Sequence, residues 1–416
     1  MALSANPVRG TRDFLPAEMR VRDAMQSIIL KTYVNNGYQR IHTPMLEDIE
    51  RLDKSDGGEN LNMIFKILKR GQKLELGKEG LKENDLADMG LRFDLTLPLS
   101  RYYANNRNEL RTPFKVIQIG EVFRAERPQK GRLREFYQCD IDVIGDPTRD
   151  AEIELIHTTA KAMQALGFRD FTVRINDRQI LFDIIKSAGF AEADVLSVCI
   201  TFDKLDKIGA EGVKAELEEK AFPPAAIDRF MEILAEDSLS TLDQAEAYCE
   251  DKDVVAQLRR VVASVEALAE GKYNIEYDKA LVRGMGYYTG TIFEISCAGF
   301  AGSVAGGGRY DKMIGAFLGE DIPAVGFSIG FERISEILLN SPELAFETGG
   351  KRIGLLYGQE DDYVEVIRRA DALRAEGYDV CTVAKGKKVG KQLAALERDG
   401  FAGACFFGEE GLKLFG

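Results

Sequence analysis

The chain has 416 residues, of which 45% are hydrophobic and 30% charged, and its formal net charge is −13 at pH 7. A chain of this length is too long for one ordinary hydrophobic core, so we expect two or three domains. The balance of apolar and charged residues is that of a soluble globular protein and excludes a disordered one. No run of about 18 apolar residues supports a membrane span, and the first 16 residues lack the apolar segment of a secretory signal. Together with six scattered cysteines, which favour a reducing compartment, this leads us to expect a cytoplasmic protein.

The six cysteines are scattered and never form a Cys-x-x-Cys pair, which argues against a zinc site and a disulfide framework. Only two histidines are present, His42 and His157, too few for a histidine-based metal cluster, and we interpret both as structural residues. We expect no protein-held metal and no organic cofactor. The negative net charge is not typical of a nucleic-acid binder, but it does not describe a local patch. Any RNA contact must therefore come from a concentrated basic segment.

The first predicted element is a helix after Pro16, where apolar residues recur at helical spacing until Asn36-Gly37 ends the run. A strand is expected near 38–44. The elements expected next are a hairpin-like stretch over 63–76 that turns at Arg70-Gly71, strands over 91–99, 114–126 and 135–144, and an amphipathic helix over 150–166, with Thr148 as a cap and Gly167 as its stop.

Residues from about 170 to 272 read as mostly helical and acidic, without glycine-rich motifs, which is typical of an inserted subdomain. Residues 341–350 contain Ser-Pro and Gly-Gly pairs and form the best linker candidate. Beyond them, strand and helix patterns alternate as in a small α/β domain. The predicted organisation is a main domain in two parts (1–168 and 273–340), a mostly helical insertion (169–272), a linker (341–350) and a C-terminal α/β domain (351–416).

The most informative stretch is FRAERPQKGRLREFYQCDIDVIG, residues 123–145. Alternation along a strand would place Tyr137 and Cys139 on an apolar face. Arg124 and Glu126 share one face of the preceding strand. The polar face of the second strand would carry Phe136, Gln138, Asp140 and Asp142. If the two strands pair, one sheet surface holds a cation, carboxylates, an amide and an aromatic ring. A solvated sheet face is the alternative interpretation.

The connector between these strands, RPQKGRLR, has eight residues, of which four are basic and none is acidic. Hairpin loops usually have two to five residues, and longer loops are often functional. A cationic arm in an acidic protein suits contact with a phosphate backbone, and arginine and glutamine can read a base edge. The alternative is a basic surface turn. The candidate nucleic-acid contacts are Arg127, Gln129, Lys130 and Arg132.

The segment LVRGMGYYTGTIFEI, residues 281–295, has glycines spaced G-x-G-x-x-x-G with no helix after them, so we reject a dinucleotide-binding motif. Residues 386–391 miss the P-loop spacing by one residue. Any ATP must therefore be held in another way. Arg283 beside glycines and next to Tyr287-Tyr288 indicates an anion contact beside a polar aromatic pocket.

A third motif follows GGGRY (306–310) and reads VGFSIGFERI, residues 325–334. It predicts a strand, a glycine turn at Gly330 and a helix whose first turn contains Arg333. A cation at a helix N-terminus is unfavourable by roughly 0.3–1 kcal/mol, so Arg333 calls for an anionic partner. A salt bridge to Glu332 is the alternative.

In this order, the three stretches resemble motif 2, the histidine-specific motif and motif 3 of the histidyl-tRNA synthetase family, which are class II aminoacyl-tRNA synthetases. RGTRDFLP (9–16) resembles the family's N-terminal signature, the first helix and strand resemble the dimer-forming motif 1, and LRFDLTLPLSRY (91–102) resembles its amino-acid-pocket strand. The likeness covers essentially the whole chain. It implies an α+β fold: an antiparallel six-stranded catalytic sheet with flanking helices, a helical insertion and a C-terminal α/β anticodon-binding domain. The chain ends at Gly416, before the final strand that the resemblance leads us to expect.

The resemblance implies that L-histidine and ATP, with Mg²⁺, form histidyl-adenylate, and that histidine is then transferred to tRNA(His) by a homodimer. The catalytic residues it implies are Arg124, Arg283 and Arg333. The implied histidine-binding residues are Asp94, Leu95, Thr96, Arg124, Gln138, Asp142, Arg283, Tyr287 and Tyr288. The implied ATP-binding residues are Arg124, Glu126, Phe136, Arg283 and Arg333. The basic connector would contact the tRNA acceptor end. Gly286 stands where the family motif usually has an acidic residue.

Two other classes of function compete with this interpretation. One is a non-catalytic paralogue, the regulatory subunit of ATP phosphoribosyltransferase, and the other is a histidine- or ATP-binding module without turnover. Such regulatory subunits tend to lack the C-terminal domain and the catalytic arginines. This chain has Arg124, Arg283 and Arg333 and a C-terminal α/β pattern, which favours the enzyme.

Overall fold

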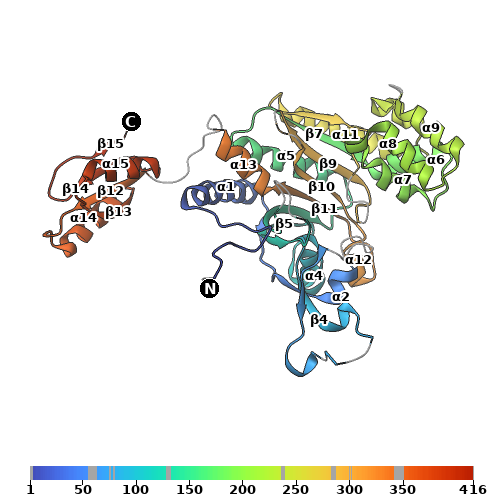
Figure 1. Cartoon of the computed structure of the whole chain (residues 1–416). Helices are drawn as coiled ribbons and strands as arrows, with labels where there is room; N and C mark the ends of the chain where they lie inside the picture. The colour runs from blue at the N-terminus through green and yellow to red at the C-terminus, as the bar shows by residue number, and fades with distance from the viewer. Residues whose placement is uncertain are drawn as a thin grey trace. The chain divides into compact units, whose positions relative to one another are not determined.

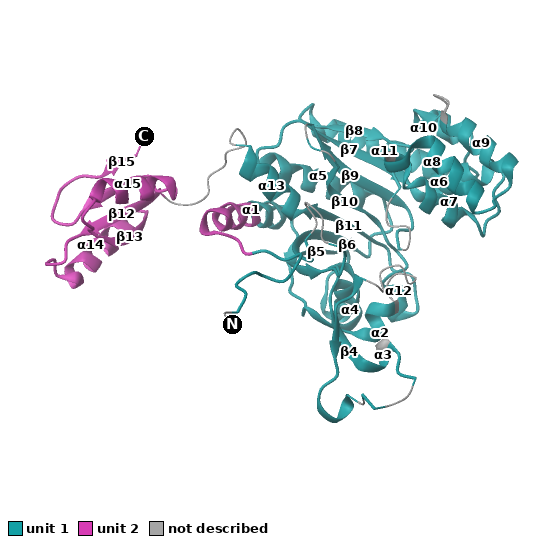
Figure 2. Cartoon of the chain, viewed as in Figure 1, with its two compact units in different colours: residues 1–12, 28–344 teal, residues 13–27, 345–416 magenta. Residues whose placement is uncertain are grey.

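The structure is a computed structural model of the chain, and it describes residues 3–54, 63–74, 76–77, 80–127, 133–235, 239–282, 287–298, 300, 302–341 and 351–415. The chain divides into two compact units (Figure 2). Unit 1 contains residues 1–12 and 28–344, and unit 2 contains residues 13–27 and 345–416.

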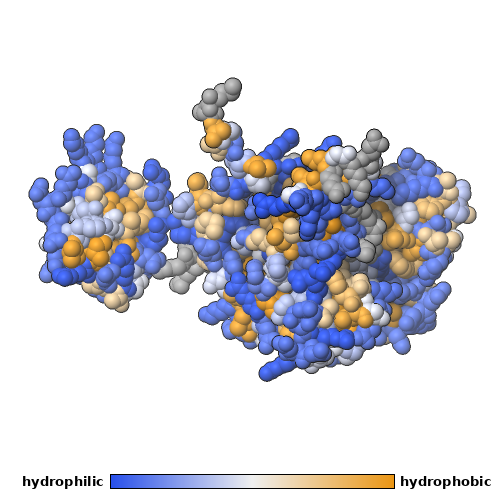
Figure 3. All heavy atoms as spheres, turned by 90° about the horizontal axis from the view of Figure 1, so that it is seen from below, coloured by the Kyte–Doolittle hydropathy of each residue, from blue (hydrophilic) through white to orange (hydrophobic). Residues whose placement is uncertain are grey.

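Hydrophilic side chains cover most of the face shown in Figure 3. Among the helices that the structure describes, none is both long and apolar enough to cross a membrane. Some large apolar side chains are nevertheless exposed in unit 1, including Val34, Met45 and Leu46, with exposed fractions of 49%, 37% and 49%. These three residues lie close to the first helix and strand that resemble motif 1.

Unit 1 is built on a large sheet in which eight described strands pair (Figure 1). The six inner strands run antiparallel to their neighbours, and each edge adds one parallel strand. In sheet order the strands are β1 (Gln39–Arg40), β5 (Phe114–Phe123), β6 (Glu135–Ile144), β11 (Ala324–Gly330), β10 (Ser303–Arg309), β9 (Thr291–Cys297), β7 (Phe171–Asp177) and β8 (Asn274–Tyr277). The predicted antiparallel six-stranded sheet is confirmed, and the two parallel edge strands extend it.

One face of this sheet is apolar and covered by helices. Cys139, Ile141 and Val143 on β6 are at most 1% exposed, as the alternation predicted. The helices α5 (Asp150–Ala165) and α13 (Phe331–Asn340) pack against β6 and β11, and α11 (Lys252–Ala269) packs against α5 and β8. The rings of Tyr137 and Phe331 have centroids 5.4 Å apart. The opposite face of β6 is therefore the one left to form a site.

Helix ends follow the glycine signals in the sequence. The first helix, α1, spans Pro16–Asn35 and is followed by Gly37, whose φ is +90°. Helix α5 is followed by Gly167, whose φ is +96°. This left-handed region favours glycine because it lacks a Cβ atom. At the start of α5, the hydroxyl of Thr148 accepts a hydrogen bond from the backbone N–H of Asp150 at 3.3 Å.

The expected strand over 91–99 is wrong. Strand β4 (Ala87–Leu91) ends at Leu91, where the expected strand would begin, and helix α4 (Thr96–Asn106) starts soon after it. The physical reason is a local cap: Oδ1 of Asp94 accepts a hydrogen bond from the backbone N–H of Leu97 at 3.1 Å. Such an acceptor satisfies an N–H of the first turn, and Pro98 is tolerated there.

The hairpin expected over 63–76 is also wrong. Strand β3 (Lys66–Leu68) pairs with β4, and residues 71–73 form a short 3₁₀ helix. The three-stranded sheet has the order β2 (Leu46–Asp48), β4, β3. Short helices follow β2 and precede β4, namely α2 (Ile49–Lys54) and α3 (Glu83–Leu86), and the 3₁₀ helix η3 (Arg107–Glu109) follows α4.

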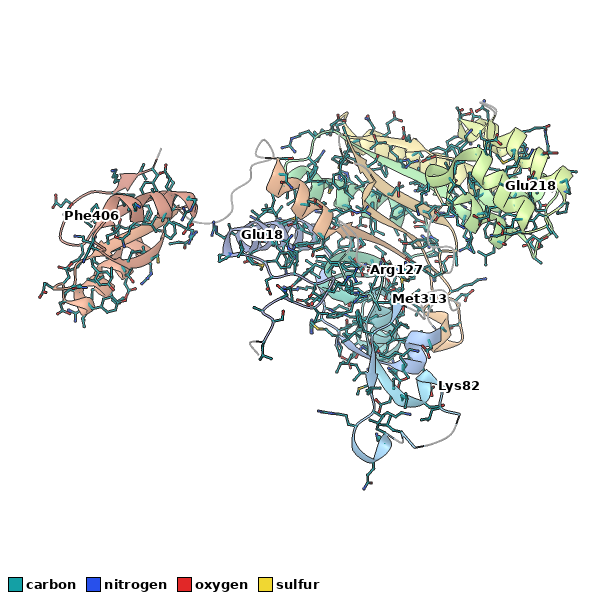
Figure 4. All side chains as sticks on the ribbon, viewed as in Figure 1. Glu18, Lys82, Arg127, Glu218, Met313 and Phe406 are labelled. Carbon is teal, nitrogen blue, oxygen red and sulfur yellow. The ribbon has the colours of Figure 1, made fainter. Side chains whose placement is uncertain are left out.

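The helical insertion is narrower than the expected range 169–272. Strand β7 pairs with β9 of the main sheet, β8 pairs with β7, and α11 packs against α5, so these elements belong to the main body. The insertion consists of α6 (Arg178–Ser187), α7 (Val195–Phe202), α8 (Leu205–Glu219), α9 (Pro224–Ala235) and α10 (Leu242–Glu246). The described residues of α6–α9 form a cluster beyond β7 in Figure 1, and Glu218 marks it in Figure 4. Phe190, Phe202 and Phe230 pack edge to face at its centre.

Unit 2 follows the predicted alternation of strands and helices. Three parallel strands, in the order β13, β12, β14, are joined by an antiparallel β15. Its elements are β12 (Lys351–Tyr357), α14 (Tyr363–Ala375), β13 (Tyr378–Ala384), α15 (Val389–Arg398), β14 (Gly403–Phe406) and β15 (Lys413–Leu414). Leu355 and Leu356 on β12 are fully buried in separate clusters, which is typical of a sheet covered on both faces.

A buried charge cluster ties the main sheet to α5. The guanidinium of Arg309, at the end of β10, donates two hydrogen bonds of 2.7 Å to the two carboxylate oxygens of Glu152. Arg149 donates to Glu152 at 2.8 Å and to Asp177 at 3.0 Å. Burial raises the pKa of Glu152, but the hydrogen bonds and charge of Arg309 outweigh it, and the net pKa lies below its usual value.

Replacing Arg309 by alanine should lower the free energy of unfolding by about 3–5 kcal/mol, because the fully buried Glu152 loses its bidentate partner. Arg229→Ala is the matched control, since the Arg229–Glu232 pair lies on the surface and exposed pairs contribute at most about 1 kcal/mol. Urea denaturation followed by circular dichroism measures both. Equal losses in the two variants would contradict a structural role for the cluster.

Candidate active site

A cavity of about 500 Å³ lies in unit 1 on the face of β6 that the helices leave uncovered. Its walls come from the β4–α4 connection, the residues that follow β5, strand β6, the tyrosine pair 287–288, strands β10 and β11, and the start of α13. Ten of the residues predicted from the sequence line it: Asp94, Thr96, Arg124, Glu126, Phe136, Gln138, Asp142, Tyr287, Tyr288 and Arg333. The fold therefore gathers into one cavity residues that are up to 239 positions apart, from Asp94 to Arg333.

Alternate residues of β6, Gln138, Asp140 and Asp142, form a polar row along the cavity floor. Across the strand pair, Asp142 lies opposite Gly326 of β11. A methyl group at Gly326 would lie 2.0 Å from Oδ1 of Asp142, so the absence of a side chain there leaves room for the carboxylate.

One end of the cavity carries positive charge. Arg124 donates from Nε to the backbone oxygen of Phe93 at 3.0 Å, and its guanidinium carbon lies 5.1 Å from the centre of the Phe136 ring. Arg333 lies in the first turn of α13, as predicted, and donates to the backbone oxygen of Ser303. Two guanidinium groups that line the same cavity as an aromatic ring suit a ligand with phosphate groups and a planar base.

The other end is polar and aromatic. Tyr310 donates its hydroxyl hydrogen to Oδ1 of Asp142 at 2.7 Å. The rings of Tyr287 and Tyr288 have centroids 4.3 Å apart and line the same cavity. Burial raises the pKa of Asp142 to about 7, despite the opposing hydrogen bond from Tyr310. A carboxyl group with this pKa can exchange a proton near neutrality with a weakly basic ring such as imidazole.

A buried hydrogen-bond network supports the β4–α4 connection that carries Asp94. The guanidinium of Arg92 donates to the backbone oxygens of Glu121 and Thr43, both at 2.8 Å. Gln118 donates from Nε2 to the backbone oxygen of Leu95 at 2.9 Å. Leu95 is itself 1% exposed and is not among the cavity-lining residues, in contrast to the predicted contact with histidine. Its contribution here is to the backbone that positions Asp94.

Several predicted residues lie outside the described part of the chain: Arg283, Gly286, Gln129, Lys130 and Arg132. The flanks of 283–286 are described. Asn176 donates to the backbone oxygen of Leu281 at 3.2 Å, and the side chain of Arg178 donates to the backbone oxygen of Tyr288. Arg127 is described and exposed, and Figure 4 labels it near the large sheet of unit 1.

Asp140, Ser328 and Tyr310 are among the cavity residues that the sequence did not single out as site residues. The signal was present for two of them. Asp140 falls between Gln138 and Asp142 on the same face of the predicted strand, and Tyr310 closes the GGGRY motif. For Ser328 we find no sequence signal that separates it from an ordinary strand residue.

A family model described as histidyl-tRNA synthetase matches residues 10–334. The chain is 41% identical over 422 residues to a histidine--tRNA ligase of Leifsonia xyli subsp. xyli, and the alignment covers 98% of this chain and 96% of that protein. The chain belongs to the histidyl-tRNA synthetase family.

Further members of the family agree with this assignment. A probable histidine--tRNA ligase of Tropheryma whipplei is 38% identical over 95% of this chain and 94% of its own length. The crystal structure of histidyl-tRNA synthetase from Nostoc sp. PCC 7120 superposes with a TM-score of 0.78 at 28% identity, covering 97% of this chain and 91% of that chain. A structure described as an ATP phosphoribosyltransferase regulatory subunit/histidyl-tRNA synthetase from Bacillus halodurans C also has a TM-score of 0.78, but at 21% identity it supports the fold alone.

Gly326→Ala should lower the affinity for L-histidine at least about tenfold, because the added methyl group displaces Asp142 and breaks its hydrogen bond with Tyr310. Gly390→Ala, in helix α15, is the matched control, since nothing lies within 4 Å of the added atom. Isothermal titration with L-histidine measures both variants. Unchanged affinity in Gly326→Ala would show that the Asp142 end of the cavity does not contact the amino acid.

Proposed function

We propose that this chain is a histidine–tRNA ligase, which activates L-histidine with ATP to histidyl-adenylate and pyrophosphate and then transfers histidine to the 3′ end of tRNA(His). One observation carries the proposal. In a member of this family, a single cavity has guanidinium groups at one end and a buried carboxyl group with tyrosines at the other. These two ends suit a nucleotide and an imidazole ring, respectively.

Adenylation is an in-line attack of the histidine carboxylate on the α-phosphorus of ATP, with pyrophosphate as the leaving group. Both reactants are anionic, so positioning and fixed positive charge supply most of the catalysis. In this proposal Arg124 and Arg333 provide that charge, and Arg283, outside the described residues, provides more. No protein nucleophile is needed, because the carboxylate of the substrate is itself the nucleophile.

The proposed binding roles follow the two ends of the cavity. Arg124 would contact the α-phosphate, Arg333 the γ-phosphate, and Phe136 with Glu126 the adenine. Asp142 and the tyrosine pair 287–288 would surround the imidazole. The residues proposed for the α-amino and carboxylate groups of histidine are Asp94, Thr96 and Gln138.

Magnesium is proposed as the ion that accompanies ATP. Among the described residues no cluster of three or more metal-ligating side chains occurs. Mg²⁺ in such sites keeps several waters and needs only one or two carboxylates besides the phosphates. Glu126 and Glu332 line the cavity and are of the required type, although Oε1 of Glu332 also accepts a hydrogen bond from the backbone N–H of Tyr137 at 3.2 Å. When bound, the ion would supply charge neutralisation at the phosphates.

The remaining proposals concern partners and location. The basic connector, with Arg127 at its described end, would contact the tRNA acceptor end, and unit 2 would bind the anticodon. The exposed Val34, Met45 and Leu46 would lie in a homodimer interface formed by motif 1. The protein would act in the cytoplasm.

The regulatory-subunit alternative is not favoured. The relatives named histidine--tRNA ligase match almost the full length of this chain, at up to 41% identity in those compared. Arg124 and Arg333 both line the cavity, and an α/β unit follows the main body. A catalytically inactive paralogue would not need these arginines.

Histidine-dependent exchange of labelled pyrophosphate into ATP is the direct test of the first half-reaction. The unmodified chain should catalyse it, and Arg124→Ala should slow it by about two orders of magnitude or more, because a preorganised charge on the transferring phosphoryl group is lost. Arg229→Ala is the control, since Arg229 lies in the helical insertion and is exposed. The proposal fails if the unmodified chain shows no histidine-dependent exchange.

A chain that ends at Asn340 should keep pyrophosphate exchange but charge tRNA(His) poorly, with a raised KM for the tRNA. The reason is that unit 2 has its own sheet and its own buried clusters, as a separately folded RNA-binding module would. Aminoacylation with labelled histidine measures the second step. Undiminished charging of tRNA would remove unit 2 from anticodon recognition.

A further inference from the structure

Asp140 is a buried carboxyl group of the cavity to which no role has been assigned. Its side chain lines the cavity and is 5% exposed, yet Oδ1 has no hydrogen-bond partner. Buried carboxyl oxygens without partners are costly, and structural carboxylates are normally saturated with donors. A buried acceptor without a donor, in a residue that lines a ligand cavity, indicates a group that is completed when a ligand binds.

The position of Asp140 specifies which part of the ligand it meets. On β6 it lies midway between Gln138 and Asp142, and residues two apart on a strand are separated by roughly 6.8 Å. Gln138 lies next to Phe136 on the floor, towards the arginine end, whereas Asp142 belongs to the tyrosine end. Asp140 therefore occupies the centre of the cavity floor.

The charges around Asp140 favour a positively charged group of the ligand at this point. Asp94 and Asp142 both face it closely enough for their charges to disfavour its ionisation. Burial is the main cause that raises the pKa of Asp140 well above its usual value, the charge of Asp142 adds to it, and the hydrogen bond from Ser328 and the charge of Arg124 oppose it. A positively charged ligand group at this point would relieve the repulsion among the three carboxyl groups.

An amino acid presents its groups in a fixed order. If the carboxylate lies at the arginine end, where it meets the α-phosphate, and the imidazole lies at the tyrosine end, then Cα and its ammonium group lie between them. We propose that Asp140 binds the α-ammonium group of the amino-acid substrate, as a carboxylate, from the centre of the cavity floor. This inference rests on the proposed function.

The commitments of neighbouring groups explain why Oδ1 of Asp140 has no donor within the protein. The side chain of Gln118, opposite Asp140 on β5, is committed to Thr43 and to the backbone of Leu95. On the other side, Ser328 of β11 lies opposite Asp140 and also accepts from Gln138 at 3.4 Å. Neither cross-strand neighbour, Gln118 or Ser328, donates a hydrogen bond to Oδ1 of Asp140, which leaves this atom available to a donor of the ligand. Asp142, by contrast, has its Oδ1 engaged by Tyr310.

The test compares two ligands that differ only in the ammonium group, L-histidine and 3-(imidazol-4-yl)propionate, in the full chain. Asp140→Asn keeps the size of the side chain and removes its charge. It should weaken L-histidine binding on the order of 10- to 100-fold, the loss expected for a charged hydrogen bond, and leave binding of the propionate within about threefold. Isothermal titration at neutral pH gives both dissociation constants.

Two further variants make the result specific. Asp142→Asn should weaken both ligands, because both carry the imidazole. Asp140→Glu retains the charge and should retain a preference for L-histidine over the propionate, which also covers the case in which the asparagine variant does not fold.

If Asp140→Asn weakens the two ligands equally, or Asp140→Glu loses the preference, Asp140 does not bind the ammonium group. The proposed function has a separate failure, which is the absence of L-histidine binding and pyrophosphate exchange in the unmodified chain.

Discussion

Period-two alternation along β6 and β10 is the constraint on which the rest of unit 1 depends. On β6, Cys139, Ile141 and Val143 point into the helix-covered core, while the residues that alternate with them, Gln138, Asp140 and Asp142, line the cavity with an amide and two carboxyl groups. A register slip of one residue would bury the carboxyl groups against the helices and turn the apolar side chains into the site. The apolar face thus fixes the register, and the register fixes the chemistry of the cavity floor.

At the end of β10 the same alternation sends two consecutive side chains to opposite faces of the sheet. Arg309 turns toward α5 and forms the bidentate pair with Glu152, and Tyr310 turns toward the cavity and donates to Asp142. The buried ion cluster therefore fixes the end of the strand from which the tyrosine hydroxyl reaches its carboxyl partner. Because buried ion pairs often contribute little net stability relative to apolar residues, we interpret this pair as one that fixes the position of the strand end.

Local signals were sufficient for much of the fold. The strand pair β5–β6, helix α5 with Gly167 at its end, and the strand–turn–helix that carries Arg333 all followed from patterns within about twenty residues. The errors have physical causes. Residues 91–99 have strand-like composition, but a local cap from Asp94 starts a helix, and β7 reads like the edge of a helical segment because its partner β9 lies more than a hundred residues away. The pairing of Tyr310 with Asp142 depends on the same kind of long-range contact, which one sequence does not display.

The buried carboxyl groups of the cavity also make the stability of the empty protein depend on pH. Asp142 has a folded-state pKa of about 7, above its value in an unfolded chain, so the folded state holds more protons between these two values. The contribution of this group to stability therefore decreases as the pH rises through that window, and the raised pKa values of Asp94 and Asp140 act in the same direction. A ligand that brings a cation to the centre of the floor reverses the effect, because it favours the charged carboxylates that burial disfavours. Preference for a cationic ligand and reduced stability of the empty site are thus two consequences of the same cluster.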